Sequence, residues 1–217
     1  MLAFSGVVLQ FPVRPIPVRS GQIVSQHKLP IRQKNAHYRS REYLTEYEVE
    51  MLLEAAGRVG RHGHRDAVLI MLAYRHGLRV TELVNLRWEQ VDIHQGLIHI
   101  NRVKRGTSSV HPLRGPEIVA LRHLQENYPI TPYVFGSERK APLSADAFRK
   151  IIARAGKEAK LPFPVHPHML RHACGYKLAQ AGQDTRAIQH YLGHKNIQHT
   201  VRYTQLSAER FKDFWQD

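Results

Sequence analysis

Apolar residues recur at helical spacing along most of the chain from Leu44 onward. Such spacing is typical of amphipathic helices, whereas residues 65–76 are apolar nearly all round, which indicates a buried central helix. The pattern predicts helices at about residues 44–56, 65–76, 80–86, from 116 onward, 144–160, 167–181, 185–192, 199–204 and 207–215. No internal repeat or low-complexity tract interrupts this series.

Several of these helices carry recognisable end signals. Thr45 and Glu48 form a capping-box pattern, in which each side chain accepts a hydrogen bond from the other residue's backbone N–H. Ser144 is a suitable N-cap for the helix that follows it. Gly57 and Gly77 are expected to end the first two helices, because glycine adopts the left-handed conformation that commonly closes a helix. The folded domain is therefore expected to span residues 44–217.

After Leu97 the apolar residues recur at every second position, which is the period of a β-strand. Ile98, Ile100 and, less clearly, Arg102 alternate with polar residues, and Gly106 follows in a turn before a second apolar run at 110–113. This pattern predicts a β-hairpin. Residues 133–135 are a candidate third strand. The expected fold class is mainly α with a small antiparallel β-sheet (α+β).

The first 43 residues differ from the rest. Residues 1–41 contain seven Lys and Arg, no Asp or Glu, and four closely spaced prolines, which break regular structure. We interpret residues 1–43 as a basic N-terminal arm, extended or partly disordered, that follows DNA phosphates. A disordered leader and an organellar transit peptide are the alternatives. A secretory signal is not expected, because residues 1–11 lack a charged start and a clear cleavage site.

Charge narrows the class of partner. The chain has 32 Lys and Arg against 18 Asp and Glu, a formal charge of +14, which is typical of a nucleic-acid-binding protein. No apolar run approaches the roughly 20 residues that span a bilayer, so a membrane role is not favoured. The single cysteine, Cys174, excludes an internal disulfide framework and suits a reducing compartment. It falls on an apolar helix face, where we expect inert packing.

Residues 166–203 concentrate groups with useful chemistry. At about 100° per residue, the helix after Pro167 is expected to have one polar and one apolar face. The polar face carries His168, Arg171, His172 and Gly175, and the opposite face carries Leu170, Cys174, Leu178 and Ala181. A Leu-Gly-His turn ending at His194 and a tyrosine at Tyr203 follow. Each of these alone has an ordinary structural explanation.

Two more residues, Arg79 and the hairpin residue Lys104, make the set coherent. Arg79 and Glu82 stand three apart at the start of a short helix, so they share a face.

Breaking a phosphodiester needs cations on the non-bridging oxygens, a nucleophile and a proton for the leaving oxygen. Arginines fit phosphate geometry, a tyrosine can attack once a histidine accepts its proton, and a hairpin lysine can protonate the leaving oxygen. No Asp/Glu cluster of metal-ligand type is apparent, which favours a cationic, metal-free site.

This pattern resembles the tyrosine recombinase (phage integrase) family over about residues 44–215. The resemblance rests on these residues: Gly77-Leu78-Arg79 with Glu82, Lys104 before Gly106, His168-x-x-Arg171-His172, Leu192-Gly193-His194, and Tyr203. The stretches HPHMLRHACGYKLA and HTVRYT look especially like the small bacterial recombinases that invert the type 1 fimbrial promoter segment.

The resemblance implies a catalytic domain that cleaves and rejoins DNA through a 3′-phosphotyrosyl intermediate, in inversion, excision or integration. It implies these catalytic roles: Arg79 and Arg171 bind the scissile phosphate, Lys104 is the general acid, His168 assists proton transfer, His194 hydrogen-bonds the phosphate, and Tyr203 is the nucleophile. Glu82 and His172 would support the pocket. Because Arg105 follows Lys104, either cation at the hairpin tip is a candidate for the acid. Further DNA contacts are expected from Arg39, Arg41, Arg105, Lys195 and Arg202.

The resemblance also implies partners. It predicts double-stranded DNA carrying specific recombination sites, a homotetramer held by the C-terminal tail, no cofactor such as ATP or a metal, and a bacterial cytoplasmic location at the nucleoid. The tail's apolar residues suit docking on a neighbouring protomer, with packing on its own domain as the alternative. Typical members have a helical domain before the catalytic one. In this chain either the basic arm substitutes for it, or DNA is held from one side and accessory DNA-bending proteins help.

Two other functions fit parts of the sequence. A non-catalytic, basic, helical DNA-binding regulator on the same scaffold is the alternative to an active enzyme, but no member of the expected catalytic set is replaced. A metal-binding protein is suggested by the 15 histidines. It is not favoured, because the pairs at 62 and 64 and at 166 and 168 lie among apolar or basic residues with one cysteine in the chain.

Overall fold

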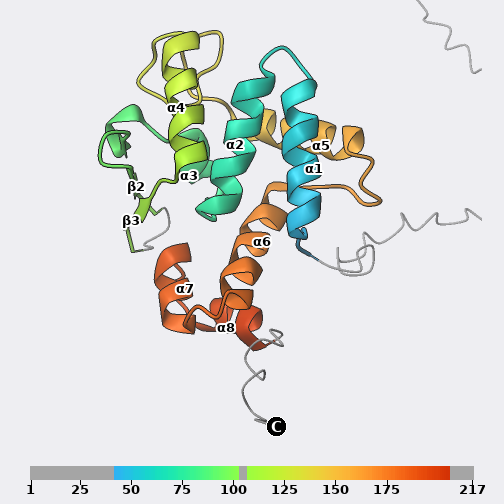
Figure 1. The fold of residues 1–217 in the computed structure, drawn as a ribbon, viewed down its shortest axis with the longest axis vertical. Helices are drawn as coiled ribbons and strands as arrows, with labels where there is room; N and C mark the ends of the chain where they lie inside the picture. The colour runs from blue at the N-terminus through green and yellow to red at the C-terminus, as the bar shows by residue number, and fades with distance from the viewer. Residues whose placement is uncertain (1–41, 103–106, 206–217) are drawn as a thin grey trace, which may run out of the picture. The chain divides into compact units, whose positions relative to one another are not determined.

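The structure is a computed structural model that describes residues 42–102 and 107–205. It is mainly helical, with one small sheet at its edge (Figure 1). The helices are α1 Glu46–Arg58, α2 Gly63–Arg75, α3 Val80–Val84, α4 Gly115–Asn127, α5 Ala145–Glu158, α6 Pro167–Gln180, α7 Thr185–Leu192 and α8 Gln198–Gln205, with a short 3₁₀ turn, η2, at Trp88–Gln90. The fold class expected from the sequence is confirmed.

Helix α2 is the centre of the core, as its all-round apolar composition predicts. It packs against α1, α4 and α6, and α1 in turn packs against α5. The capping box at Thr45 and Glu48 is present, and Ser144 accepts a hydrogen bond from the N–H of Ala147 at 3.0 Å. Gly57 does not end α1, which continues to Arg58. Gly77 does follow the end of α2, with a φ of 57°.

The sheet has three antiparallel strands in the order β1 (Val91–Asp92), β2 (Leu97–Ile100) and β3 (Ser109–Pro112). The predicted hairpin is therefore correct. The third strand, however, is β1 and not residues 133–135. That segment forms only one isolated bridge, between Arg87 and Tyr133, because it turns inward to bury Val134 and Phe135.

Helices α6, α7 and α8 pack on one another, and α6 joins them to the rest of the fold by packing against α2 (Figure 1). Asp184 caps α7 by accepting hydrogen bonds from two backbone N–H groups, and Gly193 ends it in the left-handed conformation. Helix α6 is buried on more than its apolar face, because Arg171 and Gly175 are buried with Leu170 and Cys174. Ala181, expected on the core face, is instead exposed just after the helix ends.

Candidate active site

The turn between α2 and α3 presents Arg79. Gly77 allows the chain to reverse, so that Arg79 becomes the N-cap residue of α3. Its guanidinium donates to Glu82 Oε1 at 2.7 Å, and its backbone N–H donates to Glu82 Oε2 at 2.9 Å. The Glu82 side chain is buried, whereas 27% of the Arg79 side chain is exposed. The carboxylate therefore holds Arg79 while leaving part of its guanidinium open to a ligand.

Arg171 reaches the same region from α6. Its guanidinium donates to the backbone carbonyl of Leu192 at 2.7 Å and to that of Gly77. It is buried, so the polar face predicted for α6 is an internal connection and not a solvated surface. Because the carbonyls at a helix C-terminus lack intrahelical partners, the arginine satisfies groups that would otherwise be orphaned. Arg171 thus ties the α2–α3 turn to the end of α7.

A third arginine, Arg102, joins them from just beyond the end of β2. Its guanidinium donates to Glu82 Oε2 at 2.8 Å and to the carbonyl of Tyr191. The side chain is fully buried. No motif in the sequence marks Arg102 as functional. Its position, which continues the alternation of Ile98 and Ile100, suggests only that the side chain is buried. The structure confirms that burial.

We call these three side chains the arginine cluster (Arg79, Arg102 and Arg171): two of them, Arg79 and Arg102, bind the carboxylate of Glu82, and Arg171 lies near enough to feel its charge. Burial alone would raise the pKa of Glu82, but its hydrogen bonds from Arg79 and the charge of Arg102 outweigh that effect and hold the pKa below its usual value. Burial lowers the pKa of Arg171 to about 10, helped by the neighbouring arginines. It stays protonated at neutral pH, so the site carries excess positive charge and suits an anion.

The expected histidines lie beside this cluster. Burial, then the charges of Arg171 and Arg79, lower the pKa of His168. The same causes lower the pKa of His194 to about 3. The Nδ1 atom of His194 is hydrogen bonded to Thr200 Oγ1 at 2.8 Å, which fixes the ring after the Gly193 turn. Both imidazoles are therefore neutral near pH 7, when they can accept a proton or share one with a phosphate oxygen.

Tyr203 is near the cluster but enclosed. It lies on α8 and is 1% exposed, and its hydroxyl is hydrogen bonded to His172 Nδ1 at 2.8 Å. Gly175 makes room for the ring, because a Cβ there would stand 2.6 Å from Tyr203 Cε2. Burial raises the pKa of Tyr203 to about 12, although Arg171 opposes the shift. In this conformation the hydroxyl is protected and weakly acidic.

An open groove of about 600 Å³ adjoins the site. Its lining includes Arg79, His194, Lys195 and Arg186. Lys195 was expected to contact DNA, whereas the sequence does not single out Arg186, which stands on a short helix with no motif around it. Arg202, also expected to contact DNA, is paired with Glu42 at 3.1 Å. The groove offers cations beside the exposed part of Arg79.

Several predicted positions lie outside the described residues. These are the hairpin cations Lys104 and Arg105, the arm cations Arg39 and Arg41, and the C-terminal tail. The expected division between an arm and a catalytic domain falls at the edge of the described part of the chain, so it stays a prediction.

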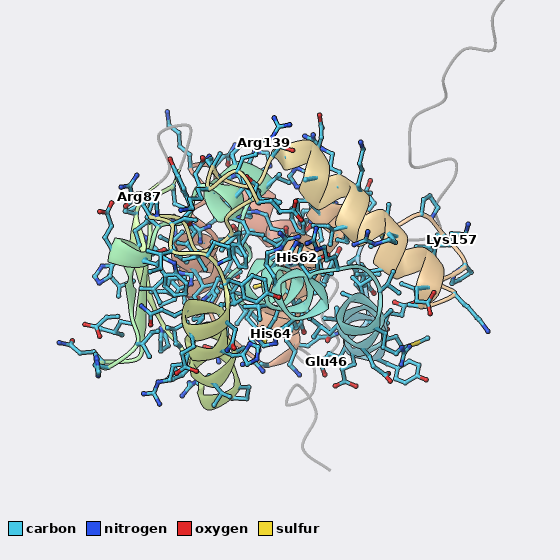
Figure 2. The ribbon with its side chains drawn as sticks, turned by 90° about the horizontal axis from the view of Figure 1, so that it is seen from above. Glu46, His62, His64, Arg87, Arg139 and Lys157 are labelled. Carbon is cyan, nitrogen blue, oxygen red and sulfur yellow. The ribbon has the colours of Figure 1, made fainter. Side chains whose placement is uncertain are left out.

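Two of the histidines that suggested a metal site, His62 and His64, have other partners. His62 Nε2 lies 3.3 Å from Glu138 Oε1, and His64 Nε2 lies 3.0 Å from the carbonyl of Ala120. Figure 2 labels both, near the start of α2. Within residues 42–102 and 107–205, no group of three or more His, Cys, Asp or Glu side chains could hold a metal ion. Over the same residues, no helix is long and apolar enough to cross a membrane.

The fold itself defines a class of protein. The crystal structure of XerA recombinase matches with a TM-score of 0.70 and 27% identity, over 81% of this chain and 65% of that chain. A structure of XerH recombinase bound to palindromic difH substrate, in a post-cleavage complex, matches with a TM-score of 0.69 at 22% identity, over 84% of this chain and 54% of that one. The architecture is that of a tyrosine recombinase catalytic domain.

The chain belongs to the Phage integrase family, whose profile matches residues 42–210. It is 48% identical over 182 residues to the type 1 fimbriae regulatory protein FimE of Escherichia coli K12, covering 81% of this chain and 91% of FimE. It is 43% identical over 188 residues to FimB of the same strain, covering 84% of this chain and 94% of FimB. The protein is a tyrosine-type site-specific recombinase, an enzyme that cleaves and rejoins DNA.

Proposed function

We propose that the arginine cluster binds the scissile phosphate and that Tyr203 is the nucleophile. The observation that carries this assignment is the charge balance: Arg79 and Arg102 bind the carboxylate of Glu82, and Arg171 adds a third positive charge beside them. A phosphodiester supplies the missing negative charge. Arg79 is the member that remains partly exposed, and it lines the groove. Arginine forks match the geometry of phosphate oxygens.

In the proposed cleavage step, the bonds and protons change as follows. The Tyr203 oxygen attacks phosphorus and its proton passes to His168, while Arg79, Arg171 and His194 stabilise charge on the non-bridging oxygens. The bond to the 5′-oxygen breaks, and Lys104 or Arg105 delivers a proton to that oxygen. The product is a 3′-phosphotyrosyl link and a free 5′-hydroxyl. Rejoining is the reverse attack by a 5′-hydroxyl, so the phosphoester energy is retained and no ATP is consumed.

Cleavage requires Tyr203 to leave its present position. Its hydroxyl is bonded to His172 and enclosed, so a phosphate in the groove does not meet it. Helix α8 is short, and movement of that helix would carry the hydroxyl towards the cluster. His172 therefore has a supporting role, holding the tyrosine until DNA and other protomers are in place.

The experiment that tests the assignment uses a DNA substrate with a nick beside the cleavage point, which traps the covalent adduct. Wild-type protein should form the adduct, and Tyr203→Phe should form none. Tyr176→Phe is a matched control, because that ring packs edge-on against Tyr203 at 5.1 Å between centroids. An adduct formed equally by Tyr203→Phe would refute the nucleophile. The absence of an adduct with wild-type protein would instead favour a non-catalytic DNA-binding role.

The arginines are tested in the same assay. Arg79→Ala should abolish cleavage while leaving most DNA binding, because many other cations supply the salt-dependent affinity. Arg171→Ala is expected to do the same, but it also frees the carbonyls of Gly77 and Leu192, so its stability must be measured in parallel. A parallel collapse of DNA binding by the folded Arg79→Ala variant would count against its role at the phosphate.

We further propose that four protomers act on two sites in double-stranded DNA, that the C-terminal tail joins neighbouring protomers, and that accessory DNA-bending proteins assist. The protein would work at the nucleoid in the bacterial cytoplasm.

The basic arm at residues 1–43 would follow DNA phosphates. Deleting residues 1–40 should weaken binding and reduce the slope of affinity against salt, because fewer counterions are released. An unchanged slope would make the arm a bystander.

A further inference from the structure

Arg102 occupies the point where three parts of the site meet. It stands two residues beyond the end of β2, and its two terminal nitrogens bind acceptors from different elements, the Glu82 carboxylate of α3 and the Tyr191 carbonyl of α7. No part of the side chain is exposed. An arginine buried to this degree touches no substrate directly, so any role in catalysis must pass through its neighbours.

Its aliphatic stem also shapes the turn before His194. Gly193 has a φ of 64°, and a Cβ added there would lie 2.8 Å from both Cγ and Nε of Arg102. The backbone of the turn is therefore packed directly on the arginine. Arg171 holds the next carbonyl, that of Leu192, from the other side. The last two residues of α7 are thus each fixed by an arginine from a different element.

We propose that Arg102 is a positioning residue for DNA cleavage. Through Glu82 it fixes the guanidinium of Arg79, and through Tyr191 and Gly193 it fixes the turn that places His194, so both groups are set before DNA arrives. This inference rests on the proposed assignment of Arg79 and His194 to the scissile phosphate. It assigns a function to a residue that carries none of the proposed chemistry itself.

The choice of residue supports a positioning role. Burying an ion pair is costly, and apolar side chains of similar volume often give equal or greater stability. A lysine would supply a point charge, whereas the planar arginine fork bonds two acceptors in fixed directions. The Glu82 carboxylate and the Tyr191 carbonyl lie in two different directions from the Arg102 guanidinium. A side chain that served only the stability of the core would not need this geometry.

A matched control is available elsewhere in the fold. Arg65 is also buried, and its Nε and one terminal nitrogen donate to Asp66 Oδ1 at 3.1 and 2.8 Å. Its other terminal nitrogen is 3.4 Å from the carbonyl of Gly136, outside the arginine cluster. Arg65→Met therefore removes the same kind of buried fork, with a similar effect on stability, from a place where it positions nothing used in cleavage.

The experiment compares wild type, Arg102→Met, Arg102→Lys and Arg65→Met on two nicked substrates. One has an ordinary scissile phosphodiester. The other has a methylphosphonate there, which lacks the negative charge on one non-bridging oxygen and so depends less on well-placed cations. Adduct formation rates, DNA affinity and urea denaturation are measured for each protein. Arg102→Lys keeps the comparison possible if Arg102→Met does not fold.

We expect Arg102→Met to cleave the phosphodiester about 100-fold more slowly with nearly unchanged DNA affinity, as a small misplacement of reacting groups does. The deficit should shrink by about tenfold on the methylphosphonate, because less charge remains to be stabilised. Arg102→Lys should recover part of the rate, and Arg65→Met should cleave both substrates like wild type. Equal deficits on the two substrates, or wild-type rates for the Arg102 variants, would overturn the inference alone. Wild-type protein that forms no adduct would overturn the proposed function as well.

Discussion

Gly193→Ala gives a quantitative test of how tightly the turn before His194 is built. Two costs add. The φ of 64° is unfavourable for a residue with a Cβ, by roughly 1–2 kcal/mol. The new methyl group would also stand 2.8 Å from Cγ and Nε of Arg102, which is held at both acceptors and cannot swing away. Overpacking of this kind costs about 1–3 kcal/mol. The variant should therefore lose about 2–5 kcal/mol of unfolding free energy.

Gly182→Ala separates the two costs. Its φ is 73°, but no atom lies within 4 Å of the position that its new methyl group would take, so only the backbone cost of roughly 1–2 kcal/mol applies. Urea denaturation of both variants measures the difference, and adduct formation on a nicked substrate measures the effect on His194. Adding Arg102→Ala to Gly193→Ala should remove the steric part, as in a double-mutant cycle. Equal losses for Gly193→Ala and Gly182→Ala would refute the tight packing of this turn on Arg102.

Buried groups give three further predictions. Burial lowers the pKa of His111 to about 3, so the stability tied to its neutral form is present above pH 6.5 and is lost as the pH falls towards 3. Unfolding free energy should drop by about 2 kcal/mol from this group between pH 6.5 and 5, measured by urea titration, and a flat profile would contradict the reasoning. Cys174 is buried and burial raises its pKa to about 12, so a thiol reagent should label it only after denaturation. Labelling of the native protein at the same rate would disprove this. Gly175→Ala should push the Tyr203 ring from its site, because the new methyl would stand 2.6 Å from Cε2. Amide exchange at residues 198–205 should then accelerate, with exchange in α1 unchanged as the control.

Local sequence signals predicted the helical framework well. The Thr45–Glu48 capping box and Gly193 mark helix ends through contacts within a few residues, which a sequence pattern can reveal. The hairpin was also visible, because Ile98 and Ile100 alternate with polar neighbours. The candidate site residues were found because their order along the chain resembles a known pattern.

Contacts between distant residues could not be predicted. Arg102 and Glu82 stand 20 positions apart, and Arg171 and Gly77 stand 94 apart, so nothing local marks either pair. The β1 strand was missed because its two residues are too few to show a period. Residues 133–135 looked like a strand because they are apolar and β-prone, but burial in the core uses that composition equally well.

The enclosed hydroxyl of Tyr203 has a consequence for how such an enzyme avoids unwanted cleavage of the chromosome. A protein this basic will meet vast numbers of phosphates that are not its target. On the proposed assignment of Tyr203 as the nucleophile, its hydrogen bond to His172 and its burial would keep a single protomer from cleaving DNA during those encounters. The proposed assembly of protomers, by moving α8, would then decide where cleavage occurs, in addition to the DNA sequence that is bound. Mutations that loosen that helix are expected to appear first as genotoxicity, before any loss of recombination.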